Sequence, residues 1–200
     1  MMRVLLVGAT GTVGKAALGE LSRRHEVVTA GRSSGDITVD LMDEESVRAM
    51  YEKAGKVDAV VVTAGHVHFG PVSTMSPEQF RKGLNDKLMG QINLVLLGQD
   101  HVNDGGSFTL VSGVLDRDPI RSGSNAAAVN GALGAFVRSA ALEMPRGIRI
   151  NVVSPGLLEE SVKKYDGFFP GHEPVSSARV GLAFAKSVDG ALTGQVIIVA

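Results

Sequence analysis

The stretch Val4-Leu5-Leu6-Val7-Gly8-Ala9-Thr10-Gly11-Thr12-Val13-Gly14 decides the fold of this chain. Its apolar run meets glycine directly and a helical pattern follows at once, so it predicts a buried strand, a tight turn and a helix. In such a unit the first glycine permits the turn, the second lets a pyrophosphate approach the backbone, and the third lets the helix pack against the sheet. We therefore expect a dinucleotide-binding turn at Gly8, Gly11 and Gly14. The alternative is a turn with a structural role only.

The rest of the chain repeats this alternation of short β-branched runs and longer amphipathic stretches. Strands are expected at residues 4–7, 27–29, 37–39, 57–62, 108–111, 149–153 and 196–199. Between them, helical spacing marks four apolar faces, formed by Val13, Ala16, Ala17 and Leu21; by Val47, Met50, Tyr51 and Ala54; by Leu84, Leu88, Ile92, Val95 and Leu96; and by Val129, Leu133, Phe136, Val137 and Ala140. This pattern predicts an α/β fold, a doubly wound parallel sheet of Rossmann type that forms a single domain over residues 1–200.

Composition excludes several classes of function. With 20 lysines and arginines against 21 acidic residues, the chain has a formal net charge of -1, which gives no general attraction to nucleic acid or to an anionic membrane. It contains no cysteine, which excludes disulfides and thiolate chemistry. No apolar run is long enough to span a bilayer, and the N-terminus is unlike a cleavable signal. We expect a cytoplasmic protein with a small-molecule substrate and without nucleic-acid or membrane partners.

Polar residues follow the second and third expected strands, where the adenosine half of a dinucleotide would lie. An NAD site usually places a carboxylate after the second strand, but here Arg32 and Ser33 follow it. A guanidinium and a hydroxyl suit a 2'-phosphate, which favours NADP, although a solvated loop arginine is the alternative. Asp40 and Leu41 end the third strand and offer a carboxylate and an apolar wall to the adenine.

Together these turns give a set of residues predicted to bind NADP (NADPH). The set comprises Gly8, Thr10, Gly11, Thr12, Val13, Gly14, Arg32, Ser33, Asp40, Leu41, Ala64, Gly65, Pro155 and Gly156. All of them follow strands at their carboxyl ends, which is where open parallel sheets bind ligands. No metal site is predicted, because His66 and His68 have no evident third ligand.

The chain resembles the short-chain dehydrogenase/reductase family over nearly its whole length. The matching segments are Gly8 to Gly14, Asp40-Leu41, Thr63-Ala64-Gly65, Phe136 to Glu143, Gly147 to Asn151, Val153-Ser154-Pro155-Gly156 and Thr193-Gly194-Gln195. The glycine spacing resembles the extended or atypical branches. The resemblance implies a seven-stranded sheet of order 3-2-1-4-5-6-7, nicotinamide dinucleotide binding, and homodimers or homotetramers built on the long helices.

The family's catalytic residues do not carry over to this sequence. The Tyr-x-x-x-Lys pair of the family falls on Ala126 and Asn130, and the position of a family asparagine falls on Lys87. The family's serine position falls on Gly113, with Ser112 one residue earlier. In the family the tyrosine protonates the carbonyl oxygen, while the lysine holds the ribose and lowers the tyrosine pKa. An atypical active site is therefore expected.

Lys87 and Ser112 are the predicted catalytic residues. A partly buried lysine has a lowered pKa that suits acid-base work, and Ser112 can replace the family serine after a shift of one residue. The alternative for Lys87 is a brace for the cofactor or for a dimer helix. His68 is a further candidate near the nicotinamide end, or else a loop histidine, and Tyr165 either acts on the substrate or packs the lid.

Two functions are compatible with these residues. The first is an NADP-dependent oxidoreductase that transfers hydride to a small carbonyl or related substrate through a non-standard active site. The second is a non-catalytic NADP-binding sensor or interaction protein on the same scaffold. A third reading, in which the dinucleotide site is also lost, conflicts with the intact glycine turn and with Arg32.

Overall fold

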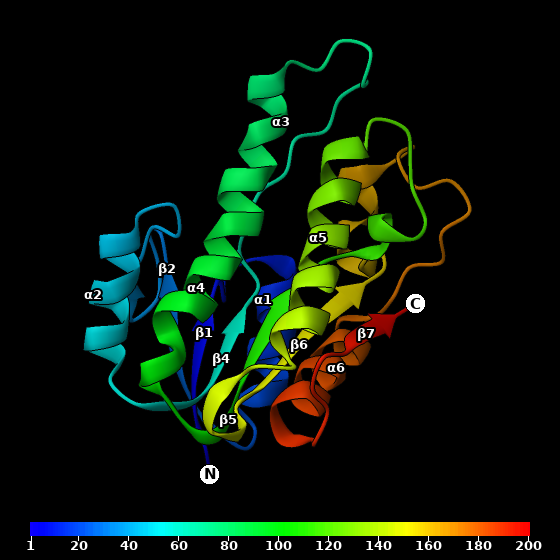
Figure 1. The fold of residues 1–200 in the computed structure, drawn as a ribbon. Coiled ribbons are helices and arrows are strands. Elements are labelled where there is room, and N and C mark those ends of the chain that lie inside the picture. The colour runs from blue at the N-terminus through cyan, green and yellow to red at the C-terminus, as the bar shows by residue number, and fades with distance from the viewer.

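The computed structural model describes residues 1–200 as one parallel sheet of seven strands, in the order β3-β2-β1-β4-β5-β6-β7 (Figure 1). The strands are β1 (Arg3–Val7), β2 (Glu26–Gly31), β3 (Ile37–Thr38), β4 (Val57–Val62), β5 (Val102–Val111), β6 (Arg149–Pro155) and β7 (Val196–Val199). The helical elements are α1 (Thr12–Leu21), α2 (Glu44–Ala54), α3 (Pro77–Gly83), η1 (Leu84–Met89), α4 (Gly90–Gly98), η2 (Gln99–His101), η3 (Val114–Asp116), α5 (Ser124–Ala140), η4 (Pro145–Gly147), η5 (Glu159–Tyr165) and α6 (Ser177–Asp189). The predicted fold class and strand order are confirmed.

Helices cover both faces of the sheet, because successive residues of a strand point to opposite faces. In β1, Leu5 and Val7 belong to the hydrophobic cluster that packs beneath α2, α4 and α5. Val4 and Leu6 belong to the second cluster, beneath α1 and α6. Strand residues buried on both faces must be apolar, which is why β1 is an unbroken apolar run from Val4 and β4 from Ala59.

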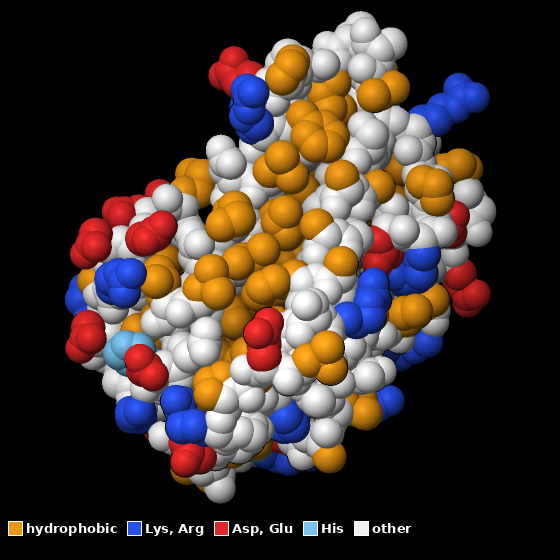
Figure 2. Space-filling view, viewed as in Figure 1, with side chains coloured by type: hydrophobic (Ala, Val, Ile, Leu, Met, Phe, Trp, Pro, Cys, Tyr) orange, Lys and Arg blue, Asp and Glu red, His pale blue; other side chains and the backbone are white.

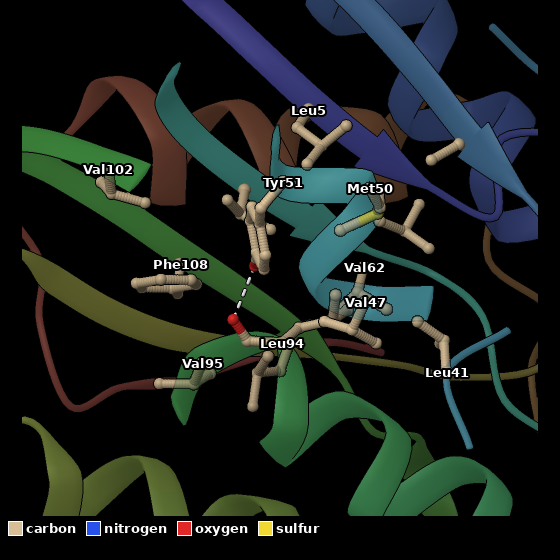
Figure 3. Packing of buried hydrophobic residues seen from close by; sticks show 14 of the residues in the cluster. Leu5, Leu41, Val47, Met50, Tyr51, Val62, Leu94, Val95, Val102 and Phe108 are labelled. Carbon is tan, nitrogen blue, oxygen red and sulfur yellow. Dashed lines mark hydrogen bonds between the residues drawn. The ribbon is translucent and has the colours of Figure 1, made fainter. Parts of the chain in front are cut away.

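The larger cluster is organised around Tyr51 of α2, which is completely buried (Figure 3). Its hydroxyl donates a hydrogen bond of 2.6 Å to the backbone carbonyl of Leu94 in α4. Burial raises the pKa of Tyr51, so the phenol stays neutral. α4 comes close enough for this bond because Gly98 has no Cβ, which would overlap the Tyr51 ring. The predicted apolar face of α2 is confirmed.

The apolar stripe predicted after Pro77 is wrong in part. Leu96 is 55% exposed, whereas Leu94, which the spacing left out, is fully buried. The cause is the segment η1, a π-helix between α3 and α4. A π-helical turn contains more residues than an α-helical turn. Positions counted from Leu84 at the α-helical period therefore no longer fall on the buried face once the chain reaches α4.

Strand β5 is longer than predicted, because it starts at Val102 rather than Phe108. Residues 103–106 are polar or glycine and look like a turn, yet they continue the strand beside β4 across a shift of register between Val57 and Ala59. These added residues lie at the amino end of β5, away from the carboxyl ends of the strands. No helix has both the length and the apolarity that a bilayer crossing requires.

Candidate active site

A cavity of about 350 Å³ lies at the carboxyl ends of β1, β4, β5 and β6. Of the predicted site residues, it is lined by Gly11, Thr12, Val13, Gly65, Lys87, Ser112, Pro155 and Gly156. The others do not line it, namely Gly8, Thr10, Gly14, Arg32, Ser33, Asp40, Leu41 and Ala64. The cavity thus joins the start of α1 to the catalytic candidates.

The three glycines of the turn are required for different reasons. Gly8 has φ +90°, and a Cβ there would lie 2.8 Å from the Ala64 backbone nitrogen. A Cβ at Gly14 would overlap the carbonyl oxygen of Gly8. Gly11 is different, because its φ is -69° and the nearest atom to an added Cβ is 3.7 Å away. Packing therefore explains Gly8 and Gly14 but not Gly11, where the backbone is open to the approach of a ligand.

The N-terminus of α1 has no side-chain cap, whereas α2, α3 and α6 are capped by Asp43, Ser76 and Ser176. The first amide groups of a helix have no partner within the helix, and they carry its positive dipole end. At α1 these amides belong to residues that line the cavity. The uncapped amides beside Gly11 fit the pyrophosphate of a dinucleotide.

Arg32 follows β2 directly, and its Nη2 lies 3.3 Å from Oδ1 of Asp40. The two side chains are 57% and 43% exposed, so the guanidinium keeps free donors toward solvent. Ser33 is exposed beside it, while Leu41 is buried in the core cluster. The structure therefore brings together Arg32 and Asp40, two residues predicted separately for the adenosine half, outside the enclosed cavity.

The amino group of Lys87 is held on the cavity wall by two acceptors. Its Nζ donates to the Ser112 carbonyl at 3.0 Å and to Oδ1 of Asn130 at 2.8 Å. Desolvation by burial lowers the pKa of Lys87 to about 8, and the negative charge of Asp116 opposes that shift. Ala126 lines the same cavity, one helical turn before Asn130. A proton on Lys87 can thus be lost near neutral pH.

Gly65 lets the helix that carries Lys87 approach the end of β4. Its φ is +129°, and a Cβ there would lie 2.6 Å from Cγ and 2.8 Å from Cα of Lys87. Next to it, the buried amide of Gln91 bonds to the carbonyl of Ala64 and to both backbone groups of Val111. Gln91 therefore fixes the ends of β4 and β5 relative to each other, between the turn and Lys87.

Ser112 continues the β5–β6 ladder, since its N–H donates to the Val153 carbonyl at 2.9 Å. Its Oγ is buried and has no hydrogen-bond partner. A buried hydroxyl without a partner is uncommon and calls for a ligand or a water. The hydroxyl therefore has no bond within the protein, while the carbonyl of the same residue accepts from Lys87.

Three aromatic residues close the other side of the cavity, and of these the sequence singled out only Tyr165. Phe69, Tyr165 and Phe169 line it, with the ring centroid of Tyr165 6.3 Å from that of Phe69 and 5.8 Å from that of Phe169. Lys164 lines it too, with Nζ 5.3 Å from the Tyr165 centroid. The two segments are almost 100 residues apart, so sequence spacing gave no signal of this wall.

The two histidines after β4 are placed differently. His68 does not line the cavity, and its backbone N–H donates to Asn125 at 2.8 Å, so the expectation of His68 beside the nicotinamide is not supported by the geometry. His66 does line the cavity. Its Nδ1 lies 3.2 Å from Oδ2 of Asp86, and its backbone N–H donates to the other oxygen at 3.0 Å.

The sheet order, the glycine turn and the site at the carboxyl ends of the strands define a dinucleotide-binding domain of oxidoreductase type. The family model described as enoyl-(acyl carrier protein) reductase matches residues 4–199. The chain belongs to the short-chain dehydrogenase/reductase family, and it is an oxidoreductase of that type.

Known proteins resemble the chain at several levels. The crystal structure of the protein lin1944 from Listeria innocua has 52% sequence identity and a TM-score of 0.99, and covers 100% of both chains. A small-chain dehydrogenase in complex with NADPH has 28% identity and a TM-score of 0.86, over 98% of this chain and 95% of that one. The tetrahydroxynaphthalene reductase of Pyricularia oryzae is 27% identical, over 96% of this chain and 86% of its own length.

Proposed function

We propose that the protein is an NADP-dependent reductase of small carbonyl compounds, with Lys87 as the proton donor of a non-standard active site. The observation that carries this proposal is the contact of Lys87 with Asn130. By the family resemblance, Lys87 takes the position of an asparagine and Asn130 takes the position of the lysine. The two side chains are hydrogen-bonded to each other at the cavity wall. The positive charge of the family site is thus kept, but it is delivered from η1 instead of α5.

The residues present fit NADPH. The uncapped amides of α1 and the open surface at Gly11 fit the pyrophosphate, and Arg32 with Ser33 suits the 2'-phosphate. The NADPH-bound relative supports this choice of cofactor. When bound, NADPH supplies the hydride that a carbonyl carbon accepts.

The chain's own residues supply the proton and the charge stabilisation. Lys87 is mostly protonated at neutral pH, and its two acceptors orient the amino group at the cavity wall. The proton moves from Nζ to the carbonyl oxygen as negative charge develops there, and solvent then reprotonates the amine. The Ser112 hydroxyl, which has no other partner, donates to the same oxygen. The small side chain of Ala126 leaves room for the carbonyl where the family has a tyrosine.

NADPH consumption with a panel of small aldehydes and ketones tests this function. Turnover by the wild-type protein that falls in Lys87→Ala and in Ser112→Ala supports the assigned roles. Turnover that neither variant changes would reject both residues. A calorimetric titration with NADPH and NADH gives the cofactor independently of turnover, and the proposal expects NADPH to bind more tightly.

A non-catalytic NADP-binding protein is the second candidate, and the alanine at position 126 favours it. A sensor would keep the cofactor site without a complete proton donor. It predicts tight NADPH binding, no turnover on any carbonyl, and a change of assembly when NADPH binds. Sedimentation with and without NADPH, beside the carbonyl panel, separates the two candidates.

We further propose that the protein acts in the cytoplasm as a homodimer or homotetramer built on α4 and α5. Figure 2 shows apolar side chains gathered in a band over these helices. Met89 and Leu96, at the start and in the middle of this region, are 41% and 55% exposed. A contiguous exposed apolar band on a monomer marks an interaction surface, and sedimentation of the Leu96→Glu variant tests it.

A further inference from the structure

The charges that line the cavity are all basic. Lys87 lies on one wall and Lys164 on the other, His66 is at the lining as well, and no aspartate or glutamate lines the cavity. Two carboxylates next to lining residues are paired with basic groups, since Asp86 bonds to His66 and Asp116 lies 3.0 Å from Arg117. An anionic ligand therefore meets two cations and no repelling carboxylate in this space.

The two lysines are not equivalent. Lys87 already donates to two carbonyl oxygens and, in the proposed function, gives its proton to the substrate carbonyl. The ammonium group of Lys164 has no hydrogen bond to any protein group, and this residue is exposed. Its charge is therefore free to pair with an anionic group of a ligand.

The wall around Lys164 is aromatic. Tyr165 contacts Phe69 in a tilted arrangement and Phe169 edge-on. Aromatic side chains of this kind bind a planar ring by stacking or by edge-to-face contact. The cavity, at about 350 Å³, must also hold the nicotinamide, so the space that remains suits a single ring.

We propose that the substrate of this cavity is a small aromatic carboxylate with a reducible carbonyl, its ring against Phe69, Tyr165 and Phe169 and its carboxylate on Lys164. This inference rests on the proposed function. The carbonyl carbon gains the hydride from NADPH and the oxygen gains the proton from Lys87. The products are a hydroxy acid and NADP, and Lys87 regains its proton from water.

Binding of three matched probes to the protein saturated with NADP tests the proposal without turnover. Benzoylformate carries both ring and charge, its methyl ester keeps the ring without the charge, and pyruvate keeps the charge without the ring. Benzoylformate is expected to bind about tenfold more tightly than either of the others, since a charged hydrogen bond and a ring contact are each of this size. Equal binding of the acid and the ester, or of benzoylformate and pyruvate, would overturn the proposal.

Substitution of Lys164 locates the carboxylate, with its exposed neighbour Lys163 as the control that does not line the cavity. Lys164→Met is expected to remove the preference for the acid over the ester, and Lys163→Met to keep it. If Lys164→Met instead weakens NADP binding and leaves the preference intact, the lysine serves the cofactor and the inference fails. NADPH turnover on neutral or aliphatic carbonyls alone would sink this inference and leave the proposed function standing, whereas no binding of NADPH would sink both.

Discussion

The two ends of the cavity follow different rules. At the start of α1, Gly8, Gly11 and Gly14 recur at intervals of three residues, and two of them are required by backbone packing. At the other end, Lys87 of η1 is bonded to Asn130 of α5, one helical turn after Ala126. Backbone geometry can be satisfied only by glycine, whereas a charge can be supplied from any neighbouring element. The turn at the start of α1 can therefore be predicted from a sequence motif, whereas the arrangement of Lys87 and Asn130 is seen only in the contacts of the structure.

The largest expected effect is at the catalytic end. Lys87→Met should lower turnover by about 10² to 10⁴, because it removes the general acid. NADPH affinity should stay within about twofold, since the uncapped end of α1 is untouched. Steady-state kinetics and calorimetry on the same preparation check both values. Lys82→Met, an exposed lysine of α3, is the control, and an equal loss there would assign the effect to the helix and not to the amine.

The cofactor end can be broken in two distinguishable ways. Gly14→Ala should cost roughly 3 kcal/mol of unfolding free energy or more, because its Cβ overlaps the backbone of Gly8. Gly11→Ala should leave stability nearly unchanged and weaken NADPH binding by about tenfold, because only a ligand needs that surface. Urea unfolding and calorimetry separate the two. Loss of stability in Gly11→Ala would remove the argument that a ligand explains this glycine.

Raising the pH should change stability and turnover in opposite directions. The pKa of Lys87 is about 8 in the folded state and near its ordinary value of 10.5 in the unfolded state. Below pH 8 the Lys87 amine is protonated in both the folded and the unfolded state, so folding carries the full free-energy cost of burying its charge. Between these values only the unfolded state holds the proton, so the unfolding free energy should rise by roughly 2 kcal/mol from pH 7 to 9.5.

Over the same range turnover should fall about tenfold per pH unit above 8, as the proton donor is lost. Urea unfolding at several pH values and a pH profile of kcat measure the two trends. Above about pH 10 ionisation of Tyr51 in the unfolded state opposes the gain, since burial raises the pKa of that phenol. If the unfolding free energy of Lys87→Met rises with pH as much as that of the wild type, the rise belongs to another titrating group.

The smallest expected effect lies at the exposed edge. Arg32→Ala should weaken NADPH by about tenfold and leave NADH unchanged, because a charged bond to a 2'-phosphate is partly screened by solvent there. The loss should shrink at high salt. Paired titrations at low and high ionic strength measure it. Equal weakening of both cofactors would place Arg32 on a part of the dinucleotide that the two share.

Most of the fold could be predicted because β1, β4 and α2 carry patterns that packing obeys directly. The stripe in α4 could not, because the π-helix at η1 shifts the phase of the helix by an amount that the sequence does not mark. In the candidate site, the turn was predicted from glycine spacing and Lys87 from the family resemblance. The bond from Lys87 to Asn130 was not, although both residues had been singled out separately, since 43 residues separate them.

The sequence by itself determined the layers of the sheet and the glycine turn, because each depends on residues close together in the chain. The tertiary structure decided which groups meet at the cavity. It brought Lys87 to Asn130, buried the Ser112 hydroxyl without a partner, and set Tyr165 against Phe69. Parallel strands end at one edge of the sheet whatever their separation in the chain, so residues from distant segments converge there, and sequence spacing carries no record of that convergence.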